Sequence, residues 1–515
     1  MSFLPAVRSF RRLLWGLLLT SSLIVLESAA AAQSPALTST PQIQATPDQD
    51  DATLHDVCFV GKTGYAVGDR GTIWKSTDAG QSWTFVPMSP ETADVSWRSV
   101  CFLTNFVGWV AGGRVRPYEQ IPEGVLYVTQ DGGTTWEPLT DQLPYLKTIR
   151  MFDLESGAAL AEPSRKYPSG LLQTSDGGRT WTAGNATRTV HWNAAAFVAP
   201  DAGILVGPLG EKAGVARGQI VPPTLPASGL RNIHGVSADR SGRCWIAGDG
   251  ALLLTSDNAG ASWGPPETTL PAALADFMRF QTVTQQGTHV WVAGSPGSII
   301  WHSADSGTSW DVQRTGDPNP IHAIQFSSES TGCAVGSLGR ISITQDGGAT
   351  WTTTRGQNRR LALLALHAHP ERMSIPLIAR QASEEGYRCG VSLFSRQDVG
   401  PDAHTAQGQG IELHSVVQSA GGNEIVTGWR LPLAVPGIAR QRDRLLEDWS
   451  LLTDRRFAEV VLTELVGQIR MWRPSAIVVD EPLPDDAASL FLRQAIEAAI
   501  AQAADPAAFP AQAKA

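Results

Sequence analysis

An eight-residue motif that recurs six times constrains the fold of this chain more than any other feature of its sequence. TQDGGTTW begins at Thr129, TQDGGATW begins at Thr344, and related stretches begin at Ser76, Thr174, Ser256 and Ser303. The shared pattern is Ser/Thr, any residue, Asp, any residue, Gly, any residue, Ser/Thr and Trp. The third and last positions are, copy by copy, Asp78 and Trp83, Asp131 and Trp136, Asp176 and Trp181, Asn258 and Trp263, Asp305 and Trp310, and Asp346 and Trp351. Such recurrence predicts one supersecondary unit repeated side by side.

The repeating unit is about 45 residues long, close to the length of a propeller blade. Only the interval from Asp176 to Asn258 is almost two units long, and WNAAAFVAPDAGILVGPLG, from Trp192, fits there as a copy that lacks the octapeptide. The front half of each unit is an alternating apolar run, a polar turn and a second apolar run that ends at Gly, which is typical of a β-hairpin. Seven units over residues 51–356 therefore predict an all-β, seven-bladed β-propeller with four strands in each blade.

The octapeptide has a structural explanation that needs no catalysis. An Asp in a hairpin turn accepts backbone N–H groups, as in an Asx turn. The following Gly supplies a positive φ that other residues resist. The Trp enters the next strand, where it is expected to pack between neighbouring blades. We therefore expect the six boxes to hold blades together.

These units resemble Asp-box (BNR) repeats, which occur in sialidases and in several non-enzymatic propellers. The combination AVGxxG with TxDGGxTW is most similar to the photosystem II stability and assembly factor family, over nearly all of residues 51–356. The resemblance implies an exported propeller that binds another protein through one of its faces during assembly of a membrane complex. A sialidase-like glycosidase is the third alternative; it would need an arginine cluster and a Tyr–Glu nucleophile pair, which do not stand out in this sequence.

The pattern changes near Leu361, where strands begin to alternate with helices. LALLALHAHP, YRCGVSLFSRQ and SAIVVDEP have the apolar runs of buried strands, and residues 442–473 have an apolar helical face. This alternation predicts a smaller α/β domain with a parallel, Rossmann-like sheet over residues 357–515. The domain resembles the LmbE/PIG-L-like N-acetylglucosaminyl deacetylases, whose two motifs correspond to AHPERM at residues 368–373 and LPDD at residues 483–486.

The resemblance places candidate site residues at these two motifs. His369 matches a zinc ligand of the family, Asp486 replaces another ligand, and Glu371 replaces the general base. Arg372 occupies the remaining ligand position, where a guanidinium cannot coordinate zinc, and Leu483 replaces a motif His. The sequence thus predicts a degenerate, truncated pseudoenzyme that needs no cofactor. The alternative is a zinc-dependent deacetylase of N-acetylated sugars in which the propeller positions the substrate.

The N-terminus has the features of a secretory signal. Residues 1–32 combine three arginines, a short apolar run from Leu13 to Leu26 and the small residues Ala29–Ala32. Residues 33–50, rich in Pro, Thr and Gln, are expected to form a flexible leader. We therefore expect an exported protein, periplasmic or extracellular, with no transmembrane segment in its mature chain. A net charge of −9 disfavours nucleic-acid binding. The five cysteines are an odd number without close pairs in the sequence, so we expect them to be structural.

Overall fold

The computed structural model describes residues 44–115, 121–139, 142–185, 189–222, 231–268, 270–271, 277–394, 396, 403–428, 430, 442–482 and 486–514. The expected signal segment, residues 1–32, and most of the expected leader lie outside the described residues. None of the described helices is both long enough and apolar enough to cross a membrane.

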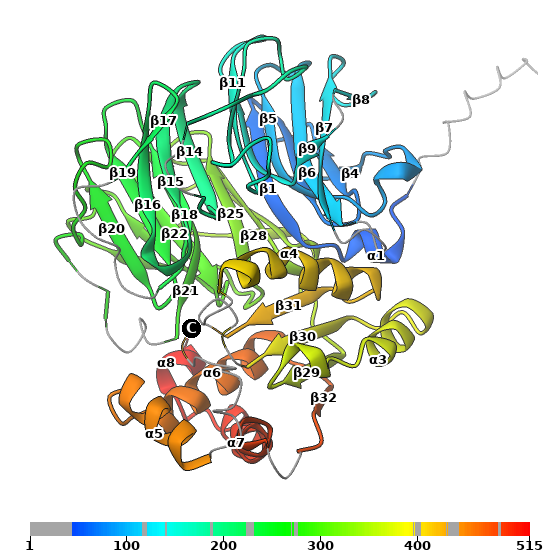
Figure 1. The fold of residues 1–515 in the computed structure, drawn as a ribbon, viewed down its shortest axis with the longest axis vertical. Helices are drawn as coiled ribbons and strands as arrows, with labels where there is room; N and C mark the ends of the chain where they lie inside the picture. Colours follow the sequence, from blue (N-terminus) through cyan, green and yellow to red (C-terminus); the bar gives the residue numbers. More distant parts are fainter. Residues whose placement is uncertain are drawn as a thin grey trace, which may run out of the picture. The chain divides into compact units, whose positions relative to one another are not determined.

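Seven antiparallel sheets are formed by the described residues between positions 54 and 355 (Figure 1). Blade 1 is β1 (Leu54–Val60), β2 (Thr63–Gly68), β3 (Ile73–Ser76) and β4 (Thr84–Phe85); blade 2 is β5 (Ser96–Phe102), β6 (Gly108–Val115), β7 (Pro122–Thr129), β8 (Glu137–Pro138) and β9 (Leu143–Pro144); blade 3 is β10 (Leu146–Met151), β11 (Gly157–Ala161), β12 (Leu171–Thr174) and β13 (Thr182–Ala183). Blade 4 is β14 (Ala194–Ala199), β15 (Ala202–Val206), β16 (Lys212–Ala216) and β17 (Gln219–Val221); blade 5 is β18 (Ile233–Ala238), β19 (Cys244–Gly248) and β20 (Leu252–Ser256). Blade 6 is β21 (Arg279–Gln286), β22 (His289–Ser295), β23 (Ile299–Ser303) and β24 (Asp311–Arg314); blade 7 is β25 (Ile321–Phe326), β26 (Gly332–Gly336), β27 (Ile341–Thr344) and β28 (Thr352–Arg355).

The seven sheets close into a ring, which confirms the predicted seven-bladed propeller. The first strands of the blades contact one another in the order β1, β5, β10, β14, β18, β21 and β25, and β25 contacts β1 again. The copy predicted to lack an octapeptide is blade 4, whose four strands pair in chain order, as they do in blades 1, 3, 6 and 7. The expected four strands are not found in every blade, because among the described residues blade 5 has three and blade 2 has a fifth, β9, which pairs with β7. Each blade is built from one continuous stretch of chain, so no strand is exchanged to close the ring.

The apolar cores of the propeller lie between blades. Seven buried clusters each combine residues of two neighbouring blades. In six of them a box tryptophan contributes to the cluster: Trp83, Trp136, Trp181, Trp263, Trp310 and Trp351. The cluster between blades 3 and 4, where no box exists, contains Trp192 instead. Blade packing thus follows from one large aromatic side chain supplied at each interface.

A bulge near the start of the first strand recurs in most blades. The bulged residue is His55 in β1, Arg98 in β5, Lys147 in β10, His234 in β18, Gln281 in β21 and His322 in β25. A bulge inserts one extra residue and turns its side chain away from the regular alternation. The repeat therefore places one polar side chain of each of these blades at the same end of the ring of first strands.

A glycine in or at the end of the second strand allows this bulge in five blades. A Cβ on Gly68, Gly112, Gly248, Gly294 or Gly336 would lie only 1.9–2.1 Å from a backbone carbonyl oxygen at or near the bulge of the first strand. Only glycine, which has no Cβ, fits such a close approach of two backbones. The repeated Gly after each second apolar run is explained by this contact.

The second part of the chain holds a small parallel sheet with helices. Its strands are β29 (Leu363–His367), β30 (Cys389–Leu393), β31 (Glu424–Thr427) and β32 (Ala476–Val479), in the order β31-β30-β29-β32. Its helices are α3 (Ile375–Ala379), continued by a π-turn over Arg380–Glu384, then α4 (Ala403–Ser419), α5 (Arg442–Leu452), α6 (Phe457–Trp472), α7 (Ala487–Ala504) and α8 (Pro510–Lys514). The predicted strands and the helical face of residues 442–473 are present; α4 and β31 had no counterpart in the prediction.

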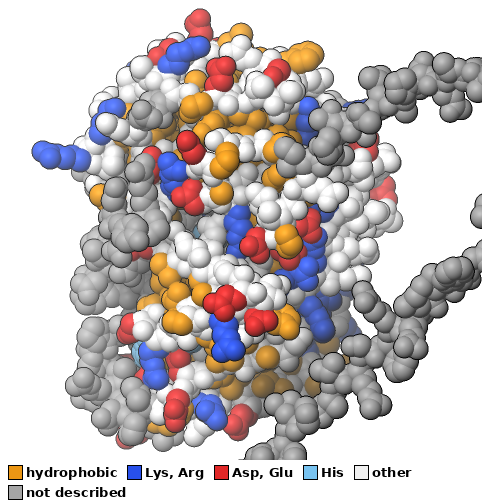
Figure 2. Space-filling view, turned by 90° about the vertical axis from the view of Figure 1, so that its right-hand side faces the viewer, with side chains coloured by type: hydrophobic (Ala, Val, Ile, Leu, Met, Phe, Trp, Pro, Cys, Tyr) orange, Lys and Arg blue, Asp and Glu red, His pale blue; other side chains and the backbone are white. Residues whose placement is uncertain are grey.

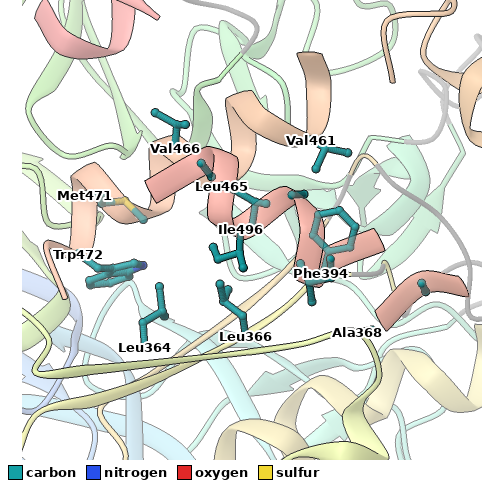
Figure 3. Packing of buried hydrophobic residues seen from close by; sticks show 14 of the residues in the cluster. Leu364, Leu366, Ala368, Phe394, Val461, Leu465, Val466, Met471, Trp472 and Ile496 are labelled. Atoms are coloured by element: carbon teal, nitrogen blue, oxygen red, sulfur yellow. The ribbon is translucent and has the colours of Figure 1, made fainter. Parts of the chain in front are cut away.

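One face of the parallel sheet packs against α6 and α7. Leu364 and Leu366 of β29 point toward Leu465 and Trp472 of α6, and Ile496 of α7 lies beside them (Figure 3). Successive residues of a strand point to opposite faces, so alternate leucines of the run LALLAL reach this cluster. This packing holds in place the strands β29 and β32, whose carboxyl ends carry the motif residues of the second part.

The end of the expected leader is ordered by ion pairs. Pro47–Asp50 forms the short helix α1, capped by Thr46. Asp50 pairs with Arg355, at 2.5 Å, and with Arg359, both just at or after the last strand of blade 7. Asp51 pairs with Arg388 at 2.7 Å, immediately before β30. This segment therefore joins blade 1, blade 7 and the α/β part, whereas the sequence predicts flexibility up to residue 50.

Candidate functional site

Each Asp box is a closed loop of local hydrogen bonds. In blade 1, the Ser76 hydroxyl donates to Asp78 Oδ1 at 2.8 Å and accepts from the Gly80 N–H at 2.8 Å. Asp78 also accepts from the backbone N–H of Ser82, at 2.9 Å, and from its hydroxyl, at 2.5 Å. The Trp83 ring N–H donates to the Gly80 carbonyl. Every polar group that the motif specifies is thus used within the turn.

The hydrogen bonds between the Ser/Thr residues and the third-position side chain recur in the other boxes, with one variation. The tryptophan contact is less uniform, because Trp181 repeats it whereas the Trp351 ring N–H donates to Gln313. In blade 5, Asn258 accepts from Ser256 and from the Ser262 N–H through Oδ1, as the aspartates do. Its Nδ2 donates to the Ser262 hydroxyl at 2.8 Å, where elsewhere a hydroxyl donates to a carboxylate. Reversing the direction of one hydrogen bond preserves the geometry, which explains why Asn is accommodated at this position.

The box carboxylates are held as anions by their own turns. Hydrogen bonds from the side chain and backbone of Ser82 lower the pKa of Asp78 to about 2, and Ser309 does the same for Asp305. A carboxylate whose oxygens already accept these bonds is a poor proton donor or acceptor near neutral pH. The boxes therefore have the chemistry of structural turns.

A second set of polar contacts lies at the opposite ends of the strands. There the bulged residue of the first strand contacts the residue that follows the second strand: His55 with Asp69 at 2.8 Å, Lys147 with Glu162 at 2.6 Å, His234 with Asp249 at 3.0 Å, and His322 with Ser337 at 3.0 Å. We call these residues the polar ring. The antiparallel order of the strands puts the polar ring and the Asp boxes at opposite ends of the blades.

Residues of the α/β part contact the polar ring and its neighbours. His414 of α4 contacts Asp69, with Nε2 3.1 Å from Oδ2. Arg279, which also pairs with Asp249, donates to the carbonyl of Thr427 at the end of β31. Thr53 donates to the Glu424 carboxyl group. The end of the propeller that carries the polar ring is therefore, at these residues, an internal surface of the protein.

Burial lowers the pKa of two histidines of this region, His55 and His322. Burial, helped by the charge of Arg98, lowers the pKa of His55 to about 4 and outweighs the opposite effect of Asp69. Burial likewise lowers the pKa of His322 to about 3. Burial alone would raise the pKa of Asp69, but His414 and His55 hold it well below its usual range. His55 and His322 are thus neutral near pH 7, and Asp69 is an ionised carboxylate.

The candidate site taken from the two motifs of the second part lies at the carboxyl ends of β29 and β32. His369 Nε2 lies 3.3 Å from Asp486 Oδ1, so the fold does bring these two residues together. Beside them, His367 Nδ1 lies 2.6 Å from Asp480 Oδ1, and both side chains are buried. Because β29 and β32 are neighbouring parallel strands, their carboxyl ends bring together motifs more than a hundred residues apart.

The guanidinium group of Arg372 lies among these residues. The Arg372 guanidinium lies 3.5 Å from Asp486 and 4.0 Å from Asp480, and it donates to the Glu481 carbonyl at 2.7 Å. Asp486 also caps α7 by accepting from the N–H groups of Ala488 and Ser489. Burial would raise the pKa of Asp486, but the bonds from Ser489 and the neighbouring His369 lower it. Arg372 therefore competes with any metal ion for the same carboxylate.

Glu371 is exposed and lies in the turn after β29. Leu483 lies outside the described residues. Within the described part of the chain, only one group of three His, Cys, Asp or Glu side chains has the spacing to hold a metal ion, and it is His55, Asp69 and His414 rather than the motif residues. Sequence reasoning missed this group, because 359 positions of chain separate its first and last members and no local motif connects them.

The fold and the sites define an Asp-box propeller protein with an appended α/β part. Residues 39–189 and 228–357 match the family described as photosynthesis system II assembly factor YCF48, which is more than half of the chain. The chain belongs to this family. The match ends at the last blade, so the α/β part lies beyond it.

Individual relatives match mainly the propeller. The photosystem II assembly protein Ycf48 of Synechococcus sp. (strain JA-3-3Ab) is 26% identical over 344 residues, covering 64% of this chain and 95% of that protein. The Ycf48 protein of Thermosynechococcus vestitus (strain NIES-2133 / IAM M-273 / BP-1) is 26% identical over 307 residues, covering 56% and 80%. The solved structure "YCF48 bound to D1 peptide" is 21% identical, with a TM-score of 0.47, and covers 60% of this chain and 99% of that chain.

Proposed function

We propose that this protein is an exported, assembly-factor-like scaffold that binds another protein through its propeller. The observation that carries the proposal is the propeller itself, which belongs to a family of assembly factors and uses its repeated motif for structure. Relatives are named photosystem II assembly proteins, and one of them is named a lipoprotein. An assembly role and export of this chain are in keeping with those names.

We further propose that the partner binds the end of the propeller that carries the Asp boxes. The opposite end contacts the α/β part at several residues. Near the boxes of blades 2 and 3, Phe106 is 65% exposed and Leu154 is 60% exposed, each in the turn between the first two strands. Large exposed apolar side chains on adjacent turns are typical of protein-binding surfaces.

The distribution of side-chain types on one face of the molecule also supports a protein partner. On the face shown in Figure 2, basic, acidic and hydrophobic side chains lie next to one another. Nucleic-acid binding normally relies on a continuous basic surface. The mixed surface supports a partner that is recognised by shape and by a few apolar contacts.

We propose that the α/β part is a Rossmann-like, LmbE-like domain that has lost its deacetylase activity. Arg372 supports this, because its guanidinium contacts Asp486, where a metal ligand would be needed. A catalytic zinc site normally has three protein ligands and an open position. His369 and Asp486 supply two, and Arg372 places a positive charge where the ion would sit.

The proposal is tested by crosslinking in the native host, followed by mass spectrometry of proteins joined to the tagged full-length chain. We expect partner crosslinks that map to the Asp-box end, and their loss in Phe106→Asp with Leu154→Asp. Val221→Asp is the matched control, because Val221 is exposed on blade 4, where there is no box. Partner crosslinks that survive the double substitution would move the binding surface elsewhere, and no partner at all would contradict the scaffold function.

The alternative, a zinc-dependent deacetylase, rests on the 3.3 Å contact between His369 and Asp486. It predicts acetate release from an N-acetylated sugar by the zinc-supplemented wild-type chain and loss of that activity in His369→Ala. We expect no activity in either. Activity in the wild type alone would contradict the proposal that the α/β part has lost its deacetylase activity.

A further inference from the structure

His55, Asp69 and His414 meet where blade 1 contacts the α/β part. His55 is the bulged residue of β1, Asp69 follows β2, and His414 lies in α4. Asp69 Oδ1 is 2.8 Å from His55 Nε2, and Asp69 Oδ2 is 3.1 Å from His414 Nε2. One ligand atom from each residue lies within 4.8 Å of the others.

These separations suit a common metal ion. Zinc–nitrogen bonds of about 2.0–2.1 Å and zinc–oxygen bonds of about 2.0–2.2 Å place neighbouring ligand atoms of a tetrahedron about 3.3–3.5 Å apart. Small movements of three side chains would bring the present distances to that range. A donor set of two imidazoles and one carboxylate also favours zinc over calcium and magnesium, which take oxygen ligands.

We propose that His55, Asp69 and His414 bind a divalent transition-metal ion, zinc by preference, and that the ion joins the propeller to the α/β part. Two ligands come from blade 1 and the third from α4, so the complete ligand set exists only when both parts are in place. The proposal is independent of the assembly function and of the motif site at His369.

The surroundings of Asp69 support a metal site and also identify its competitor. Ser96 donates to Asp69 Oδ1 at 2.5 Å, which orients the carboxylate as outer partners of metal ligands do. The Arg98 guanidinium lies 3.1 Å from His55 Nε2 and must turn aside for the ion to bind. We therefore expect Arg98→Met, which removes the charge and keeps the apolar stem, to strengthen binding.

The test measures zinc affinity of the chelator-stripped full-length chain by competition with a chromophoric chelator, with metal content checked by mass spectrometry. We expect one tight zinc per wild-type chain and weakening of more than about 100-fold in His414→Ala, since even outer partners of ligands are worth about 10- to 100-fold. His302→Ala is the matched control, because it removes a histidine of β23 that contacts Asp311 outside this group, and it should keep wild-type affinity. His369→Ala is measured beside it to separate this site from the deacetylase alternative. Cobalt absorption provides a second reading of tetrahedral coordination that does not depend on stability.

Three results would overturn the proposal. They are absence of a tight zinc in a folded wild-type chain, unchanged affinity in both His414→Ala and His55→Ala, and loss of zinc in His369→Ala alone. Melting temperature separates folding from binding: zinc should raise it in the wild type and not in His414→Ala, because only a protein that binds the ion in its folded state is stabilised. The third result would instead support the deacetylase alternative and would leave the propeller's partner binding untouched.

Discussion

At the scale of single residues, the boxes use two chemically different side chains for one geometry. Asn258 keeps the loop by donating to Ser262 where the aspartates accept. We therefore expect Asp176→Asn to lower the melting temperature by only a fraction of the loss caused by Asp176→Ala, which leaves donors of Thr180 without their acceptor. Thermal unfolding of the two variants checks this. Equal losses would mean that charge, rather than the hydrogen-bonded loop, stabilises the turn.

A buried acidic residue makes stability depend on pH. Burial alone would raise the pKa of Asp249, but His234 and Arg279 hold it well below its usual range. Because the folded pKa lies below the unfolded value of about 3.9, this group stabilises the fold above that pH and loses its contribution as the pH falls. Asp249→Asn should cost about 3 kcal/mol at pH 7, since it leaves the largely buried Arg279 guanidinium without its counter-ion.

The difference between wild type and Asp249→Asn should shrink as the pH falls below about 4, where the unfolded carboxyl binds a proton. Denaturant unfolding at pH 7 and at successively lower pH measures it. A difference that stays constant with pH would show that the cost of the substitution is not linked to ionisation.

At the scale of elements, the bulge and its glycine act as a pair. A Cβ on Gly112 would lie 2.0 Å from the Ser96 carbonyl oxygen, whereas a Cβ on Gly214, in β16, would have no neighbour closer than 3.8 Å. Gly112→Ala should therefore destabilise the protein by about 1–3 kcal/mol, as overpacking does, and Gly214→Ala should be tolerated. Denaturant titration compares the two. If both alanines behaved alike, the close approach would not explain the recurrent glycine.

At the scale of the whole molecule, Asp51 links three regions of the chain. Its side chain is 13% exposed and lies 3.0 Å from Arg359 and 2.7 Å from Arg388. We expect Asp51→Asn to lower the free energy of unfolding by about 1.5–3 kcal/mol, the range for hydrogen bonds to charged groups. Hydrogen exchange should also report faster opening of blade 1 and of β30.

Asp94 provides the matched control for Asp51, because its side chain is 58% exposed and lies 3.4 Å from Arg114. Exposed ion pairs of this kind contribute about 0–1 kcal/mol, so Asp94→Asn should change stability little. If the two substitutions had equal effects, the ion pairs of Asp51 would not stabilise the junction between blade 1, blade 7 and the α/β part.

The local repeat determined the propeller. Apolar alternation, turn residues and the recurrent Gly act within a few positions of one another, so the sequence was sufficient to predict seven blades and to find the copy without a box. It was also sufficient to predict three of the four parallel strands of the second part, β29, β30 and β32, from their apolar runs. The box contacts belong to this category too, because the partners of Asp78, Ser76 and Ser82, lie two and four positions from it.

Only the tertiary structure decided which residues meet across the chain. The ion pair of Asp51 with Arg388, the position of Arg372 between two carboxylates, and the meeting of His414 with Asp69 join residues that share no local pattern. Such contacts depend on closure of the ring and on where α4 stands beside blade 1. Sequence periodicity reports the face on which a side chain lies, and it carries no information about what a distant segment places opposite that face.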